Sequence, residues 1–188
     1  AVVRFIPHDI PKLDALHLPE VLKDLVMERR GLILVVGAAG SGKSTTIASM
    51  IDHRNELVTG HVLTFEDPIE FLFSSSKSCV IQREVGIDTD SFTNALRSAM
   101  RMNPDVIMVG EMRDLETIEA CVKAAETGHL VLSTLHTHNT ASTVNRIVGY
   151  FPPDAQENTR QRLAASLTAV ISIRLGRGKT GETGLPGL

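Results

Sequence analysis

The segment from Leu32 to Ser44, LILVVGAAGSGKS, joins an apolar run to a glycine-rich stretch that ends in lysine and serine. It matches the phosphate-binding loop pattern G-x-x-x-x-G-K-[ST], with Gly37, Gly42, Lys43 and Ser44 at the defining positions. Glycines allow consecutive backbone N–H groups to surround a phosphate chain, because no Cβ stands in the way. The lysine can place a positive charge on the terminal phosphates, and the serine hydroxyl can bind Mg²⁺.

The flanking residues favour phosphate binding over a glycine-rich turn without a ligand. A β-type apolar run precedes the loop, and the helix-compatible run SGKSTTIASMI follows it. The positive N-terminal end of such a helix also favours an anion. We therefore expect ATP and Mg²⁺ to bind through Gly37, Ala38, Ala39, Gly40, Ser41, Gly42, Lys43, Ser44 and Thr45.

Hydrolysis needs a carboxylate in addition, since a phosphate-binding loop alone does not position the attacking water. The run NPDVIMVGE places Glu111 at the C-terminal end of a predicted strand, which is where ligands bind in open α/β sheets. Glu111 is the first catalytic candidate and, with Ser44, a candidate Mg²⁺ ligand, directly or through water. The alternative is a capping or solvent-facing glutamate. Asp105 begins the same strand and is predicted to be structural.

A second acidic cluster, FEDPIE, follows the apolar run HVLTF at residues 61–65. It contains Glu66, Asp67 and Glu70, and Pro68 stiffens the chain where it leaves the strand. An ordinary solvated loop is the alternative for such a cluster. Because the acids again follow a strand, we predict that Glu66 is the second catalytic carboxylate.

Three histidines lie in the segment TGHLVLSTLHTHN. His129 opens a predicted strand, and His136 lies at its far end, where it can donate to a γ-phosphate or report it to a neighbouring subunit. Zinc is the rival ligand, because His136 and His138 are two residues apart. No cysteine or third ligand accompanies them at a known zinc spacing, so no zinc is predicted. His138 is interpreted as a solvated loop residue.

Four arginines are candidates for reaching the γ-phosphate of an adjacent subunit. Such a cation can contribute roughly 10³–10⁵ in rate. The alternative is that they are ordinary surface charges, and the sequence does not distinguish among Arg83, Arg97, Arg101 and Arg113.

Apolar runs alternate with helical patterns along most of the chain. Strands are predicted at 32–36, 61–65, 79–82, 105–110, 129–135 and 169–175, and helices near 43–57, 91–102, 114–127, 140–149 and 153–169. Several runs are apolar on consecutive residues, which suits parallel strands buried on both faces. The pattern predicts an α/β domain with a mostly parallel sheet. Helix N-caps are predicted at Ser91, Asp114 and Thr140, and a helix stop at Gly128.

The composition is that of an ordinary globular protein. The 188 residues are 43% hydrophobic and 22% charged, and the net charge of −3 does not suggest a nucleic-acid surface. No apolar run approaches the roughly 18 residues of a membrane helix, and no signal-peptide pattern opens the chain. Cys79 and Cys121 are predicted to be buried, reduced thiols of a cytosolic protein.

The two ends of the chain differ from the middle. Residues 1–18 are interpreted as a strand remnant and a linker from a preceding domain. A helix is predicted to begin at Pro19 and to stop at Gly31, within an ATPase domain that covers residues 19–175. The glycine-rich stretch 176–188 is predicted to be a flexible loop or tail.

Four segments, GAAGSGKST, TFEDPIE, NPDVIMVGEMRDLET and AAETGHLVLSTLHT, together resemble the secretion-ATPase superfamily, and within it the PilT/PilU-type retraction ATPases of type IV pili. The resemblance spans roughly residues 4–175. It implies a RecA-like fold, a triphosphate and Mg²⁺ on Lys43 and Ser44, and an acidic pair of Glu66 and Glu111. It also assigns His129 and His136 to a histidine box.

The resemblance further implies a hexameric ring at the cytoplasmic base of the pilus, on an inner-membrane assembly platform protein, where ATP hydrolysis drives pilin removal and twitching motility. A pilus-extension or type II secretion ATPase is the nearest alternative. Those relatives usually carry paired C-x-x-C zinc motifs, which this chain lacks. A P-loop kinase and a ring component that binds ATP without hydrolysing it are more distant alternatives.

Overall fold

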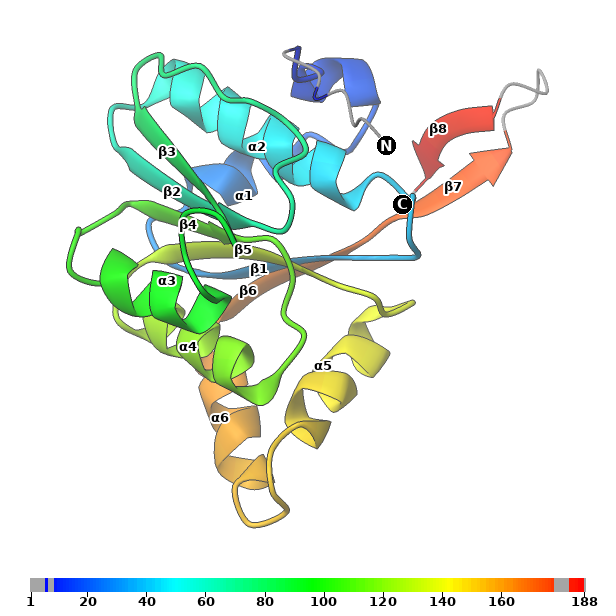
Figure 1. The fold of residues 1–188 in the computed structure, drawn as a ribbon. Coiled ribbons are helices and arrows are strands. Elements are labelled where there is room, and N and C mark those ends of the chain that lie inside the picture. The colour runs from blue at the N-terminus through cyan, green and yellow to red at the C-terminus, as the bar shows by residue number, and fades with distance from the viewer. Residues whose placement is uncertain (1–5, 7–8, 178–182, 188) are drawn as a thin grey trace.

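The computed structural model describes residues 6, 9–177 and 183–187. At its centre is a six-stranded sheet in the order β3-β2-β4-β5-β1-β6, and every neighbouring pair is parallel (Figure 1). The strands are β1 Gly31–Val36, β2 His61–Glu66, β3 Cys79–Glu84, β4 Val106–Val109, β5 Leu130–Leu135 and β6 Leu167–Ser172. Strand β5 lies between β1 and β4. This parallel sheet with helices on both faces confirms the predicted RecA-like α/β fold.

Helices cover both faces of the sheet (Figure 1). One face carries the 3₁₀ turn Leu13–Leu16 with α1 Val21–Met27 and α2 Lys43–Leu57. The other carries α3 Phe92–Ala99, α4 Leu115–Glu126, α5 Thr140–Gly149 and α6 Gln156–Ser166.

Strand β1 shows why the apolar runs are continuous. Leu32 and Leu34 pack toward α3 to α6, whereas Ile33 and Val35 pack toward α1 and α2. Successive side chains of a strand point to opposite faces, so a sheet covered on both sides needs an apolar residue at every position. All six residues of β1 are buried.

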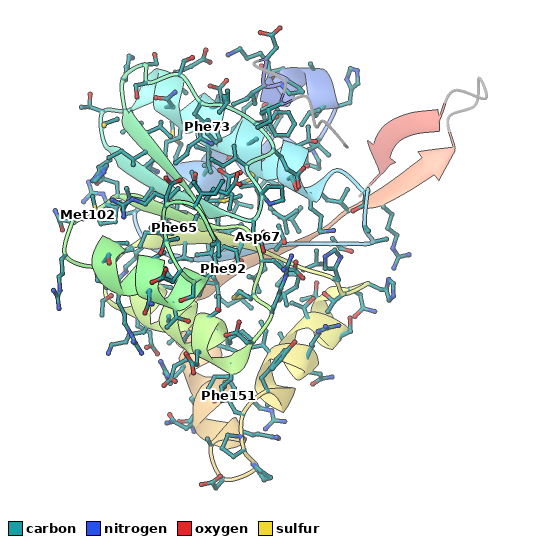
Figure 2. The ribbon with its side chains drawn as sticks, in the orientation of Figure 1. Phe65, Asp67, Phe73, Phe92, Met102 and Phe151 are labelled. Carbon is teal, nitrogen blue, oxygen red and sulfur yellow. The ribbon has the colours of Figure 1, made fainter. Side chains whose placement is uncertain are left out.

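Three phenylalanines contribute to the mainly aliphatic layer under α3 to α6 (Figure 2). Phe65 of β2 and Phe92 of α3 belong to this core, as does Phe151 beyond the end of α5. Full burial of one such side chain stabilises the fold by roughly 1.5–3 kcal/mol. Met102, in contrast, lies at the surface and is 38% exposed.

Three of the predicted helix signals are confirmed. The side chain of Ser91 accepts a hydrogen bond from the backbone of α3, and that of Asp114 does so for α4. Gly128, with φ +104°, follows the end of α4.

Two other signals are displaced along the chain. The cap of α5 is Asn139, not Thr140, because the Asn139 side chain and Ser142 form a reciprocal capping box. Helix α1 ends at Met27 and Gly31 begins β1 instead, since the backbone of Gly31 pairs with that of β5.

The C-terminal predictions are wrong in detail. Helix α6 ends at Ser166, and the next strand covers Leu167–Ser172, because pairing with β1 outweighs a helical pattern that continues to 169. The stretch predicted to be a loop contains strands: β7 Arg174–Arg177 pairs antiparallel with β8 Thr183–Gly187. Residues 178–182 and 188 of the predicted tail lie outside the described residues, as do 1–5 and 7–8 of the predicted N-terminal remnant.

The two cysteines differ in burial. Both thiols are free, but Cys79 is exposed on β3 and only Cys121 is buried, so burial was predicted wrongly for Cys79. No helix among the described residues is long and apolar enough to cross a membrane.

Candidate active site

The phosphate-binding loop connects β1 to α2 at the carboxyl edge of the sheet. Gly42, with φ +95°, immediately precedes the first residue of α2. Gly37 has φ +156°, and a Cβ there would lie 2.4 Å from the Ile173 carbonyl oxygen and 2.6 Å from Ser41 Oγ. Both positions therefore require glycine for the loop to keep this shape.

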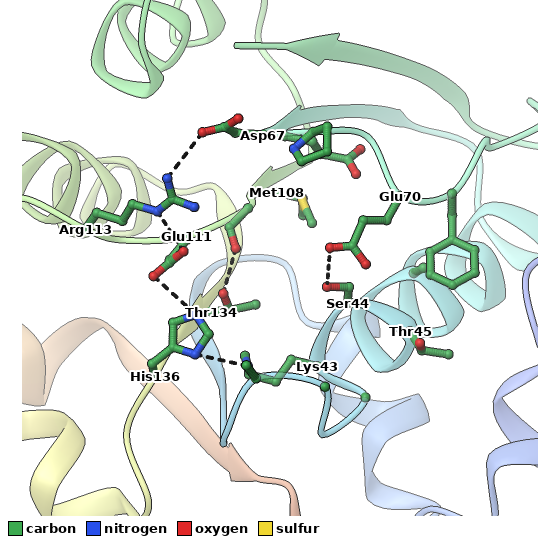
Figure 3. Close-up of a pocket in the computed structure, with 18 of the residues that line it drawn as sticks. Lys43, Ser44, Thr45, Asp67, Glu70, Met108, Glu111, Arg113, Thr134 and His136 are labelled. Carbon is green, nitrogen blue, oxygen red and sulfur yellow. Dashed lines mark hydrogen bonds and ion pairs between the residues drawn. The ribbon is translucent and has the colours of Figure 1, made fainter. Parts of the chain in front are cut away.

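Lys43 is buried beneath this loop. Its Nζ donates to the carbonyl oxygens of Gly37 at 3.1 Å and Ala38 at 2.8 Å, and lies 3.4 Å from His136 Nδ1 (Figure 3). Burial lowers the pKa of Lys43, while the charges of Glu111 and Glu70 raise it. The ammonium therefore has acidic groups facing it across the site, and only carbonyls and an imidazole in direct contact.

One hydroxyl of the loop has no partner. Ser41 Oγ is buried and makes no hydrogen bond among the described residues. It lies inside the loop, next to Gly37, and Ser41 does not line the cavity beside it. The fit to a phosphate chain therefore rests on the glycine conformations and on Lys43.

A cavity of about 400 Å³ opens beside the loop. Its walls come from the start of α2 and from the segments that follow β2, β4 and β5. The lining includes Gly40, Gly42, Lys43, Ser44, Thr45, Glu66, Asp67, Glu70, Phe71, Phe73, Glu111, Arg113, Thr134 and His136.

Glu111 lies between Arg113 and His136 (Figure 3). Its Oε2 accepts a hydrogen bond from Arg113 Nε at 2.7 Å, and its Oε1 lies 3.4 Å from His136 Nε2. The other ring nitrogen of His136 faces Lys43. Thr134 of β5 holds the backbone that leads to Glu111, since its Oγ1 donates to the Gly110 carbonyl oxygen at 2.7 Å.

Glu66 is the most buried acid of the site, with 6% of its surface exposed. Its Oε1 accepts hydrogen bonds from Thr64 Oγ1 at 2.7 Å and from Gln82 Nε2 at 3.0 Å. Burial raises the pKa of Glu66, whereas these two hydrogen bonds lower it. A carboxyl group with a raised pKa in a cleft is suited to proton exchange.

Glu70 contacts the predicted metal ligand Ser44. The Ser44 hydroxyl donates to Glu70 Oε1 at 3.2 Å (Figure 3). Hydroxyl and carboxylate oxygens are the ligands that Mg²⁺ takes, so Ser44 and Glu70, which are in contact, fit this ion. The predicted ligand Glu111 lines the same cavity, but its two oxygens face Arg113 and His136. The acidic cluster was recognised in the sequence, but which member reaches the serine depends on the path of the 67–73 loop.

The structure corrects the assignment of His129 to the site. It precedes the amino end of β5, is 9% exposed, and does not line the cavity. Its Nδ1 lies 3.1 Å from the Ala124 carbonyl oxygen at the end of α4, and 3.4 Å from Thr127 Oγ1. The six residues of β5 span roughly 20 Å, which separates His129 from the phosphate-binding loop. Of the two histidines assigned by resemblance, only His136 reaches the site.

The surroundings of His138 do not suggest a metal site shared with His136. Its side chain is exposed, and its carbonyl oxygen accepts hydrogen bonds from Ser172 Oγ and Arg174 Nη2. Among the described residues, no three His, Cys, Asp or Glu side chains form a group that could hold a metal ion through protein ligands alone.

One of the four candidate arginines lines the cavity, and the other three do not. Arg113 lies in the cavity of its own chain, where it pairs with Glu111 and, at 3.3 Å, with Asp67. Arg83 is half-buried on β3, and Arg97 and Arg101 are exposed on and after α3. None of these three lines the cavity.

The fold and the site define a class of protein. It is a RecA-like domain whose phosphate-binding loop faces acids from two neighbouring strands. Residues 11–182 match the family model described as Type II/IV secretion system protein. The chain belongs to this family.

Two curated relatives are similar over most of this chain. It is 53% identical over 175 residues to a twitching motility protein of Neisseria gonorrhoeae, covering 93% of this chain and 47% of the relative. It is 52% identical over 175 residues to the type IV pilus retraction ATPase PilT of Pseudomonas aeruginosa, covering 93% and 51%. The chain thus spans about half the length of these relatives.

Solved structures agree with this assignment. The pilus retraction motor PilT with bound ADP superposes with a TM-score of 0.93 at 52% identity, covering 96% of this chain and 53% of that one. The ATPase DotB of Legionella pneumophila superposes with a TM-score of 0.91 at 35% identity, covering 96% and 50%.

Proposed function

We propose that the protein carrying this chain hydrolyses Mg²⁺-bound ATP and is the motor for retraction of type IV pili and twitching motility. The observation that carries the proposal is the cavity that Lys43 lines together with Glu66 and Glu111, in which the charges of Glu111 and Glu70 act on the lysine. It lies on a chain 52% identical to a structure described as a retraction motor with bound ADP.

In this proposal each side chain has a defined task. Bound ATP supplies the γ-phosphoryl group, and Mg²⁺ neutralises charge on its oxygens. Lys43 exchanges its bonds to the loop carbonyls for bonds to phosphate oxygens. Glu111 orients the attacking water and takes its proton on Oε1, the oxygen that faces His136 and accepts no hydrogen bond from Arg113. Glu66, at the end of the neighbouring strand, is the second acid beside the γ-phosphate.

The proposal extends to assembly and location. By resemblance to the retraction motors, the protein forms a homohexameric ring on the cytoplasmic face of the inner membrane, against the pilus assembly platform protein. Arg83, Arg97 and Arg101 stay candidates for completing a neighbour's site, because they do not line the cavity of their own chain.

A pilus-extension or type II secretion ATPase is the alternative function. It is disfavoured because those motors usually carry paired C-x-x-C motifs, and the two cysteines here, Cys79 and Cys121, are far apart in sequence.

Two measurements test the proposal. Purified whole protein should release phosphate from ATP without any added acceptor, which a kinase would not do. Deletion of the gene in its host should abolish twitching while surface pili persist or accumulate. Loss of the pili themselves would point to extension, and unchanged pili with unchanged twitching would contradict a retraction motor. Sizing the protein with and without ATP and Mg²⁺ tests the ring.

A further inference from the structure

Gln82 links three parts of the site, although it has no predicted role. It lies on the edge strand β3, in register with Thr64 of β2. Its Nε2 donates to Glu66 Oε1 at 3.0 Å and to the Phe71 carbonyl oxygen at 2.8 Å. Its Oε1 accepts from the Phe73 backbone N–H at 2.9 Å. Both N–H donors of this amide are therefore engaged.

These contacts hold a catalytic acid and a wall of the cavity together. Phe71 and Phe73 both line the cavity, and so does Glu66. Glu66 Oε1 takes one hydrogen bond from its own strand, through Thr64, and one from Gln82. The backbone of Glu70 is a further hydrogen-bond partner of this carboxylate. At 6% exposure little water is available to replace a lost donor, so removing Gln82 should disturb the position of the carboxylate.

We propose that Gln82 is a positioning residue for catalysis, which orients the Glu66 carboxylate and fastens the segment Phe71–Phe73 against the cavity. The inference rests on the proposed ATP hydrolysis and deepens it. Gln82 itself does not touch the phosphate site.

The chain offers a matched control on the same strand. Glu84, two residues along β3, accepts a hydrogen bond from the Ile69 backbone N–H at 2.9 Å through its Oε2. It therefore fastens the same loop but has no hydrogen bond to Glu66. A role in loop structure alone would be shared by Glu84 and Gln82, whereas orientation of Glu66 belongs to Gln82.

The two roles differ in how they depend on the Glu66 side chain. If Gln82 acts by orienting the Glu66 carboxylate, its loss should matter only while that carboxylate is present. If Gln82 only fastens the loop, its loss should act in the same way whether or not position 66 carries an acid.

The experiment compares Gln82→Leu with Glu84→Leu in the whole protein. We expect Gln82→Leu to lower kcat for ATP hydrolysis about 10–10²-fold, with little change in KM. Glu84→Leu should lower kcat less. Unchanged kcat in Gln82→Leu, or an equal loss of kcat in both variants, would overturn the inference.

A second variant and a second readout keep the test decisive. Gln82→Met keeps the length of the side chain, carries no charge and removes the donor to Glu66. It should therefore also lower kcat, and it gives the test a second variant should Gln82→Leu not fold. In a Glu66→Gln background, Gln82→Leu should have no further effect on kcat, and multiplying losses would contradict the proposal.

Crystal structures of the wild type and of Gln82→Leu should show a displaced Glu66 carboxylate in the variant, and they need no turnover. An inactive wild type whose carboxylate is displaced in Gln82→Leu would reject the proposed hydrolysis alone. An active wild type whose carboxylate stays in place in Gln82→Leu would reject only the role of Gln82.

Discussion

The two ends of β5 carry one histidine each, and the two side chains have opposite surroundings. At the carboxyl end, His136 is 44% exposed and lies between Lys43 and Glu111. At the amino end, His129 is 9% exposed and contacts the last turn of α4. In a parallel sheet the loops at the carboxyl edge meet around ligands, whereas the opposite edge is free to serve stability.

We therefore expect catalysis and stability to depend on opposite ends of β5. Variants at the carboxyl edge should change binding or turnover and leave unfolding nearly unchanged. Variants at the amino edge should do the reverse.

The largest effect is expected for Lys43→Ala at the carboxyl edge. Turnover should fall below detection and ATP affinity at least about 10²-fold, because charge-assisted hydrogen bonds to the phosphates are lost. Titration with a fluorescent ATP analogue measures the affinity, with Lys77→Ala, at an exposed lysine outside the cavity, as control. Unchanged affinity would remove Lys43 from the site.

Glu111→Gln should retain ATP but lose roughly 10²–10⁴ of kcat, the range expected for a missing general base. The amide keeps the shape of the side chain, so binding measured by titration should stay near that of the wild type. Glu116→Gln, at an exposed acid in the first turn of α4, is the matched control. Near-normal turnover in Glu111→Gln would assign the base to Glu66.

The two histidines should give opposite results when each is replaced by alanine. His136→Ala is expected to lower kcat about 10–10²-fold with little change in stability, since the side chain is half exposed. His129→Ala should lower the free energy of unfolding by about 1–3 kcal/mol and change kcat by less than about twofold.

Urea unfolding and phosphate release on the same preparations check this pair. A large loss of kcat in His129→Ala without a loss of stability would restore His129 to the catalytic group that resemblance assigned.

The smallest effect is expected for Glu126→Gln, near the amino edge. Glu126 accepts two hydrogen bonds from Arg162 at 2.9 Å each, which join α4 to α6 and lower the pKa of Glu126. The ion pair should contribute about 0.5–1 kcal/mol at neutral pH. Because the folded pKa is depressed, this stability is present above pH 4.5 and disappears as the pH falls through the folded value.

Urea unfolding over a series of pH values from 7 downward measures this contribution. The difference between Glu126→Gln and the wild type should be constant above pH 4.5 and shrink at lower pH. A difference that stays constant until the wild type unfolds in acid would show that packing, not charge, joins the two helices.

Much of the fold could be predicted because its signals are local. The run LILVV, the glycines after it and the caps Ser91 and Asp114 all act within a few residues of themselves. The C-terminal strands were misplaced because their pairing is not local: β6 is defined by β1, more than a hundred residues earlier, and β7 by β8.

The site was predictable in part for the same reason. Glu66 ends a strand, Lys43 and Glu111 come soon after one, and parallel strands end at one edge of the sheet. Gln82 could not be found from sequence, because its role depends on the register that places it beside Thr64 and close to Glu66.

By itself the sequence determined the phosphate-binding loop, the parallel sheet and the acids at the strand ends, because each is encoded by residue type and short-range spacing. Only the tertiary structure decided which histidine reaches Glu111, which acid contacts Ser44 and which arginine pairs within its own chain. Those outcomes depend on strand order, register and loop path, which bring together side chains that lie far apart in the sequence.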